Sequence, residues 1–222
     1  MNQRPLQRMR LIGVAVLAVA TVFLTPLAPA FTAQDVLPRS CQTDCVSAYG
    51  NVLGSARGGV PAYSNCNASC VVFSPNTEKG VYTGIKWQCV EFARRWLLVN
   101  KGVVYGDVDV AADIWSKISV FKRVADGKEI PVQAHLNGSV QSPEVGDLLI
   151  YAKEFLNTGH VAVITAVNTA EGMIEVAEQN FANSKWPGGY ARKIEMVQRN
   201  GKNWLLDPYL IGWKHVTADA QH

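Results

Sequence analysis

Four of the five cysteines in this sequence lie close together, and their spacing limits how the N-terminal part of the chain can fold. Cys41 and Cys45 form one C-x-x-x-C pair, and Cys66 and Cys70 form a second. In the cytosol such a set would suggest a zinc site, whereas an oxidising compartment favours two disulfides. Because residues 31–80 are otherwise rich in Gly, Ser, Asn and Pro, we expect loops held together by these four cysteines. The spacing leaves all three possible connectivities open.

The first thirty residues have the three parts of an export signal, which decides between zinc and disulfides. Three arginines form its basic region: Arg4, Arg8 and Arg10. An apolar run follows at residues 11–24, and Ala28-Pro29-Ala30 supplies a small-x-small cleavage site. An uncleaved membrane anchor is the alternative, although Pro26 would disturb the end of such a helix. We therefore predict a cleaved signal peptide at residues 1–30, a periplasmic or secreted protein without stable membrane insertion, and two disulfides.

The arginines of that segment also account for the whole net charge. The sequence carries 21 Lys and Arg against 18 Asp and Glu, so 21 − 3 = 18 basic side chains remain for 18 acidic ones. A formally neutral body offers no field to hold a phosphate backbone, which argues against nucleic acid as a partner. A hydrophobic content of 48% with 18% charged residues is typical of one globular domain.

The fifth cysteine, Cys89, lies in the first turn of a helix predicted from Trp87 to Asn100. Four residues recur on one face of this helix at i, i+4, i+7 and i+8: Cys89, Ala93, Trp96 and Leu97. Gly102 follows as a helix stop. An odd cysteine in an exported protein is a free reactive thiol or an intermolecular partner, and a buried core cysteine is the structural alternative. A helix N-terminus favours the thiolate, the reactive form.

The fold class follows from the order of the remaining patterns. A second helix is predicted at residues 110–118, with Asp109 placed to cap it. Five short β-type runs come after Pro131: Val145–Tyr151, His160–Val167, Met173–Asn180, Ala191–Val197 and Leu210–Lys214. This order predicts an α+β fold with N-terminal helices packed on an antiparallel β-sheet. We expect a loop-rich segment at residues 31–80 and a catalytic core at residues 81–222.

His160 is the candidate base for the Cys89 thiol. If residues 160–167 and 173–180 pair as a hairpin, His160 faces Glu178 when paired residue numbers add to 338, and Asn180 when they add to 340. Both registers stay open, and both place an acceptor across from the imidazole. A purely structural histidine at a strand end is the alternative.

These residues predict acyl transfer by a thiol. Cys89 would attack the carbonyl, His160 would carry the proton and Glu178 would fix the histidine tautomer, with a thioester intermediate. Gln88 is a candidate oxyanion donor together with the backbone N–H of Cys89, or else an ordinary helix-start residue. Since neither HExxH nor HxH spacing occurs, we predict no metal site and no cofactor.

Three segments resemble the CHAP amidases, in particular the amidase half of glutathionylspermidine synthetase/amidase. They are residues 84–95 (GIKWQCVEFARR), 158–162 (TGHVA) and 177–180 (AEQN). The resemblance implies a papain-like (CHAP/NlpC-type) fold and the same triad of Cys89, His160 and Glu178. It also implies that Arg94 and Asn180 help to bind substrate, although Arg94 could pair on the helix surface and Asn180 could cap a strand end.

Two departures from this family bear on the substrate. Its members commonly join the amidase to an ATP-dependent synthetase, whereas no Gly-rich P-loop occurs in this sequence. The export signal and the paired cysteines are also unlike a cytosolic enzyme. We therefore expect hydrolysis of an amide in a glutathionylspermidine-like conjugate or, alternatively, in a cell-wall peptide of peptidoglycan. A catalytically idle CHAP-like binding module is the non-enzymatic alternative, and the oligomeric state is not predicted.

Overall fold

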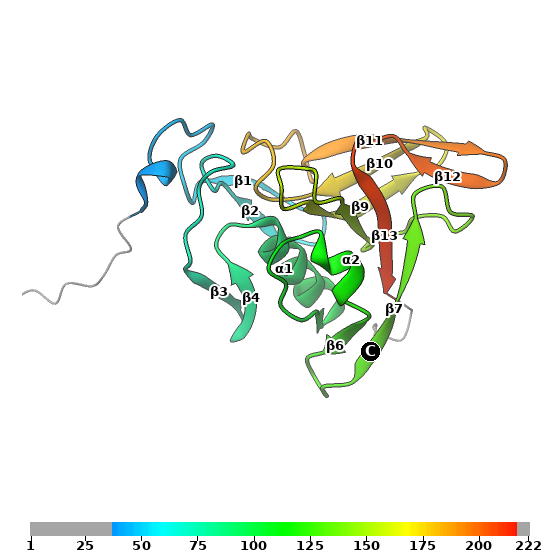
Figure 1. The fold of residues 1–222 in the computed structure, drawn as a ribbon, viewed down its shortest axis with the longest axis horizontal. Coiled ribbons are helices and arrows are strands. Elements are labelled where there is room, and N and C mark those ends of the chain that lie inside the picture. Colours follow the sequence, from blue (N-terminus) through cyan, green and yellow to red (C-terminus); the bar gives the residue numbers. More distant parts are fainter. Residues whose placement is uncertain (1–36, 217–222) are drawn as a thin grey trace, which may run out of the picture. The chain divides into compact units, whose positions relative to one another are not determined.

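The computed structural model describes residues 37–216, so the predicted signal peptide at residues 1–30 lies outside the described residues. These residues belong to one compact unit that spans Asp35–His222. Strands are far more numerous than helices in it, and a helix lies next to the middle of the largest sheet (Figure 1). No helix within residues 37–216 is long and apolar enough to cross a membrane.

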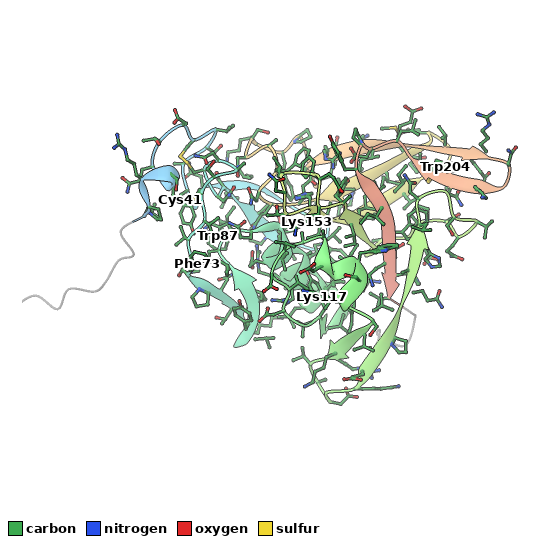
Figure 2. The ribbon with its side chains drawn as sticks, in the orientation of Figure 1. Cys41, Phe73, Trp87, Lys117, Lys153 and Trp204 are labelled. Carbon is green, nitrogen blue, oxygen red and sulfur yellow. A yellow bond between two sulfur atoms is a disulfide. The ribbon has the colours of Figure 1, made fainter. Side chains whose placement is uncertain are left out.

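Nine strands form one sheet in the order β12-β11-β10-β9-β8-β13-β7-β6-β5, and every neighbouring pair is antiparallel. Their bounds are β5 Val103–Val104, β6 Val120–Arg123, β7 Glu129–Leu136, β8 Leu148–Tyr151, β9 His160–Asn168, β10 Met173–Ala177, β11 Arg192–Arg199, β12 Lys202–Leu205 and β13 Leu210–Val216. The edge strand β12 carries Trp204, which stays partly exposed (Figure 2). The sheet is thus a ladder in which β8 and β9 hold central places.

Two separate hairpins precede the first helix. One pairs β1 (Val52–Ser55) with β2 (Pro61–Tyr63), and the other pairs β3 (Pro75–Glu78) with β4 (Val81–Ile85). Glycines with positive φ, a backbone conformation that side chains disfavour, make their turns, as at Gly80 with φ of 78°. The Gly- and Asn-rich composition that predicted loops therefore supplies tight turns between short strands.

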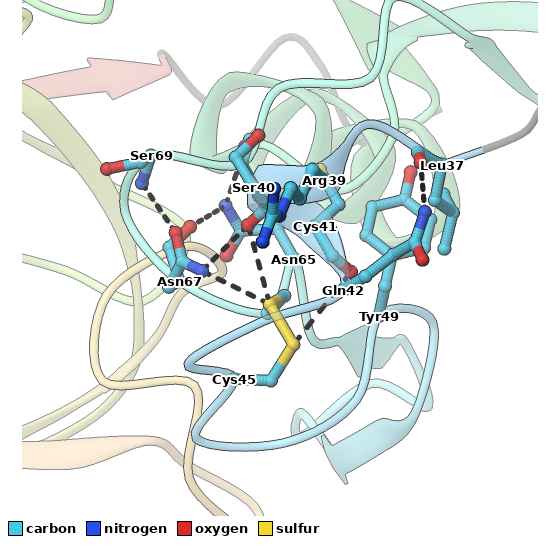
Figure 3. Close-up of a disulfide and its surroundings, with 12 residues drawn as sticks. Leu37, Arg39, Ser40, Cys41, Gln42, Cys45, Tyr49, Asn65, Asn67 and Ser69 are labelled. Carbon is cyan, nitrogen blue, oxygen red and sulfur yellow. Dashed lines mark hydrogen bonds between the residues drawn. A yellow bond between two sulfur atoms is a disulfide. The ribbon is translucent and has the colours of Figure 1, made fainter.

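Two disulfides tie the segment ahead of these hairpins, which begins with the short helix η1 (Arg39–Cys41), to the connection between the two hairpins. Cys41 is bonded to Cys70 and Cys45 to Cys66, so the second loop lies inside the first. Asn67 donates from Nδ2 to the carbonyl oxygens of residues 40 and 43, next to the Cys45–Cys66 bond (Figure 3). The structure thus selects one of the three connectivities that the sequence left open.

The predicted α+β fold with N-terminal helices packed on an antiparallel β-sheet is wrong. Residues 37–216 are mostly β, with thirteen strands and only two α-helices. The second predicted helix, residues 110–118, shortens to α2 (Asp113–Lys117), and no side chain caps its start. Asp109, the expected cap, instead lies 3.6 Å from the ammonium of Lys117. The sheet also begins before Pro131, since β5 and β6 precede it.

Helix α1 (Cys89–Lys101) packs on one face of the central strands. Phe92 and Leu97 are fully buried, and each such side chain contributes about 1.5–3 kcal/mol of hydrophobic stabilisation. They share a cluster with alternate residues of β8 and β9: Leu148, Ile150, Val161 and Val163. The intervening residues pack in a second cluster with Trp213 of β13. Gly102 ends the helix in the left-handed conformation, as its position predicted.

Candidate active site

Cys89 is the first residue of α1 and the only cysteine within residues 37–216 that is not in a disulfide. Its side chain lines a cavity of about 670 Å³ and is 8% exposed. Gln88 precedes it in an extended conformation and makes no side-chain cap to the helix. The first N–H groups of α1 therefore remain available near the sulfur, where the positive end of the helix dipole favours negative charge.

His160 begins β9 and is 2% exposed. Its Nε2 lies 2.8 Å from Oε2 of Glu178, the residue that directly follows β10. The β9–β10 ladder ends with Ala177 opposite Val163, a register that would set Asn180 opposite His160 if the strand continued. The strand ends there instead, so the carboxylate of Glu178 contacts the imidazole.

The neighbours of His160 favour its protonated form. Burial lowers the pKa of the imidazole, but the charge of Cys89, its hydrogen bond and the contact with Glu178 together raise that pKa to about 9. Burial raises the pKa of Glu178, yet its net shift is downward because His160 and Arg192 stabilise the carboxylate. Since Glu178 occupies Nε2, Nδ1 is the ring nitrogen left to exchange a proton with Cys89.

Gln88 and Asn180 line the same cavity as Cys89. Asn180 donates from Nδ2 to Oε1 of Gln88 at 2.7 Å, and Gln88 donates from Nε2 to the carbonyl oxygen of Cys70 at 3.3 Å. This pair of bonds orients the Gln88 amide. Because Nε2 carries two hydrogens and Cys70 accepts one, the second can serve an oxyanion beside Cys89. The donor role expected for Gln88 stays a prediction.

Arg94 also lines the cavity, but most of its guanidinium is already bonded. Nη1 donates to the carbonyl oxygen of Thr83 at 3.0 Å, and Nη2 donates to that of Gly106 and contacts Asp107, both at 2.9 Å. The guanidinium also lies over the Tyr105 ring at 4.8 Å. Its Nε is buried and has no hydrogen-bond partner within residues 37–216.

The rest of the cavity wall is mixed, with apolar side chains on one part and the charged Asp107, Asp109 and Lys117 on another. The disulfide-linked segment, the chain after it and β4 contribute Ala68, Val71, Phe73, Tyr82 and Ile85. Phe73 is 84% exposed. Within residues 37–216, no group of three or more His, Cys, Asp or Glu side chains could hold a metal ion.

Sequence reasoning missed a buried cluster that ties the end of β10 to α1. Glu91 and Arg95 form an ion pair at 2.7 Å between consecutive turns of the helix. Gln179 joins them, since it donates from Nε2 to Glu91 at 3.0 Å and accepts from Arg95 at 3.0 Å. The i,i+4 spacing of Glu91 and Arg95 on an otherwise apolar face was the available sign. Because Gln179 sits between Glu178 and Asn180, this cluster holds both beside the helix start.

A second missed residue is Arg192, the first residue of β11. It donates from Nε to Oε1 of Glu178 at 2.6 Å, on the carboxylate oxygen that His160 leaves free. The sequence offered no local pattern for this contact, because Arg192 reads only as the polar start of a strand. The structure therefore brings the predicted Cys89, His160 and Glu178 together, with Gln88, Asn180 and Arg94 on the same cavity.

Comparisons with known proteins match this region. The CHAP domain model covers residues 80–180. The chain is 40% identical over 190 residues to the bifunctional glutathionylspermidine synthetase/amidase of Escherichia coli, which covers 78% of this chain and 30% of that protein. It is 39% identical over 160 residues to the trypanothione synthetase of Crithidia fasciculata, covering 72% and 24%. The chain thus spans less than a third of these relatives.

Proposed function

We propose that this chain, in which residues 80–180 match the CHAP domain, is a hydrolase of amide bonds and that Cys89, His160 and Glu178 perform the hydrolysis. The observation that supports this assignment is the position of one imidazole between two groups. Its Nε2 is held by the buried Glu178 carboxylate at 2.8 Å, and the free thiol of Cys89 lines the same cavity and helps to raise the pKa of the ring. This is the arrangement of nucleophile, base and orienting group that acyl transfer requires.

The reaction proceeds in two steps. The Cys89 thiolate attacks the carbonyl carbon, and the oxyanion accepts hydrogen bonds from the Cys89 backbone N–H and Gln88 Nε2. His160 then gives its Nδ1 proton to the leaving amine as the C–N bond breaks, which leaves a thioester. Water attacks the thioester while His160 takes its proton, and the carboxylic acid leaves as the thiolate forms again. Glu178 keeps Nδ1 directed at the sulfur in both steps.

The proposed substrate is a glutathionylspermidine-like conjugate, cleaved at the amide that joins its acid and amine parts. The names of the relatives support this choice, because they denote enzymes of glutathionylspermidine and trypanothione. A cell-wall peptide has no such support. We also propose that the protein is exported and works outside the cytoplasm, for which the two disulfides are the supporting feature.

Mass spectrometry of the products tests this proposal. Purified protein incubated with glutathionylspermidine should release spermidine and glutathione, and Cys89→Ala should abolish the release. His215→Ala is the matched control, because His215 pairs with Asp147 at 2.7 Å in the same manner but away from Cys89. That variant should keep its activity. If the protein releases fragments from muropeptides but cleaves no glutathionylspermidine, the proposed substrate is wrong. If it cleaves neither compound, the chain is a binding module and not an enzyme.

A further inference from the structure

We propose that Arg192 is a positioning residue of this active site, one that acts through Glu178 and does not touch the substrate. The inference rests on the proposed function, since it assigns Arg192 to the same triad. It starts from the two oxygens of the Glu178 carboxylate. Oε2 contacts His160 Nε2 at 2.8 Å, and Oε1 accepts from Arg192 Nε at 2.6 Å. With one oxygen held on each side, the carboxylate cannot rotate away from the imidazole.

Arg192 is itself held by groups from other parts of the sheet. Its Nη1 donates to Oδ2 of Asp207 at 2.7 Å, and its Nη2 donates to the Tyr151 hydroxyl at 2.9 Å. Tyr151 donates to the same Asp207 oxygen at 2.6 Å, which closes the network. Every nitrogen of the guanidinium therefore has a partner, and its planar geometry fits three acceptors that a point charge could not serve together.

An aromatic ring covers this network. The guanidinium of Arg192 lies 4.5 Å from the centre of the Phe181 ring, and the His160 ring lies 5.4 Å from the same ring. Phe155 stacks on Phe181 at 6.0 Å. Because the side chain of Glu178 is only 1% exposed, water reaches the carboxylate poorly. A buried carboxylate in such a place depends on its cationic partners.

The charged and titratable groups around Glu178 determine the pH at which its carboxylate is protonated. They come from several elements: His160 in β9, Arg192 in β11, Tyr151 in β8 and Asp207 after β12. Burial raises the pKa of Glu178, and His160 and Arg192 outweigh burial to lower it. Without the Arg192 cation that pKa rises, so Glu178 is protonated at a higher pH. A neutral Glu178 no longer stabilises the imidazolium, and the proton returns to the Cys89 sulfur.

The experiment follows both amidase activity and the alkylation of Cys89 by iodoacetamide as functions of pH. In Arg192→Met we expect the acid limb of both profiles to move to higher pH, and kcat to fall roughly ten- to a hundredfold with KM little changed. Arg192→Lys keeps the positive charge but loses the planar guanidinium that binds three acceptors. Its acid limb should therefore stay near that of the wild type, while its kcat should recover only in part. Arg57→Met is the control. Arg57 forms an ion pair at 2.8 Å with Glu175 of β10, the strand that Glu178 follows, but it does not contact Glu178 or His160.

The outcomes separate the inference from the function on which it rests. An acid limb in Arg192→Met that coincides with the wild type would reduce Arg192 to a structural residue. If the acid limb moves as far in Arg192→Lys as in Arg192→Met, the role of the charge is refuted. Arg192→Lys also tests the inference by itself if Arg192→Met does not fold. If the wild type cleaves no amide, the alkylation profiles still report on Arg192, because they need no substrate.

Discussion

Replacing Cys41 and Cys70 by serine should lower both the stability of the protein and its activity. The two residues are 29 apart in sequence. Opening a loop of that length raises the entropy of the unfolded chain, which lowers the free energy of unfolding by about 3.6 kcal/mol at 25 °C. The same reasoning assigns about 3.3 kcal/mol to Cys45–Cys66, whose residues are 21 apart. The loops are nested, so the loss of both disulfides should cost less than the two losses added.

Activity should distinguish these two double variants although their stabilities are similar. The Cys70 carbonyl oxygen accepts from Gln88 Nε2 at 3.3 Å, and it also accepts from Asn65 Nδ2 at 3.2 Å. Without the bond to Cys41, the chain around Cys70 is less firmly held. The Cys70 carbonyl oxygen then no longer fixes the orientation of the Gln88 amide. We expect kcat/KM to fall roughly tenfold in Cys41→Ser/Cys70→Ser, a change of about 1.4 kcal/mol in the barrier, and less in Cys45→Ser/Cys66→Ser.

Urea unfolding followed by tryptophan fluorescence measures the stabilities, and steady-state kinetics under native conditions measures the activities. The reasoning would be refuted if the free energy of unfolding changed by less than about 1 kcal/mol, because the loop entropy would then be offset in the folded state. Equal losses of kcat/KM in the two double variants would refute the link between the Cys70 carbonyl and Gln88.

Two further predictions concern the triad and the oxyanion. Glu178 raises the pKa of His160, which stands at about 9, so Glu178→Gln should move the alkaline limb of kcat/KM to lower pH. Asp147→Asn, which perturbs the corresponding pair with His215, should leave that limb in place, and an unmoved limb in Glu178→Gln would contradict the role of Glu178. Gln88→Ala should lower kcat roughly a hundredfold with little change in KM, as loss of one oxyanion donor does. A change confined to KM would show that Gln88 binds the ground state instead.

Local pattern was enough to predict the element that carries the nucleophile. Helix α1 has apolar residues at helical spacing and Gly102 at its end, and both features act within a few turns of chain. Strands β8, β9, β10, β11 and β13 were all predicted, with end points shifted by a few residues, because their apolar runs stand out in the sequence. By contrast, β1 to β7 and β12 escaped prediction. Most of them are short, several contain Pro or Gly, and pairing with a partner strand, more than intrinsic preference, stabilises them.

The sequence by itself therefore determined which residues we propose for the chemistry, namely a lone cysteine at a helix start and a histidine one hairpin away from an acceptor. Tertiary structure decided which acceptor contacts the histidine. The β9–β10 ladder stops at Ala177, and Gln179 binds Glu91 of α1, so Glu178 reaches the imidazole while Asn180 turns to Gln88. The disulfide pairing and the contact of Arg192 with Glu178 were decided in the same way. Each joins residues distant in sequence, and only packing of the whole domain sets such distances.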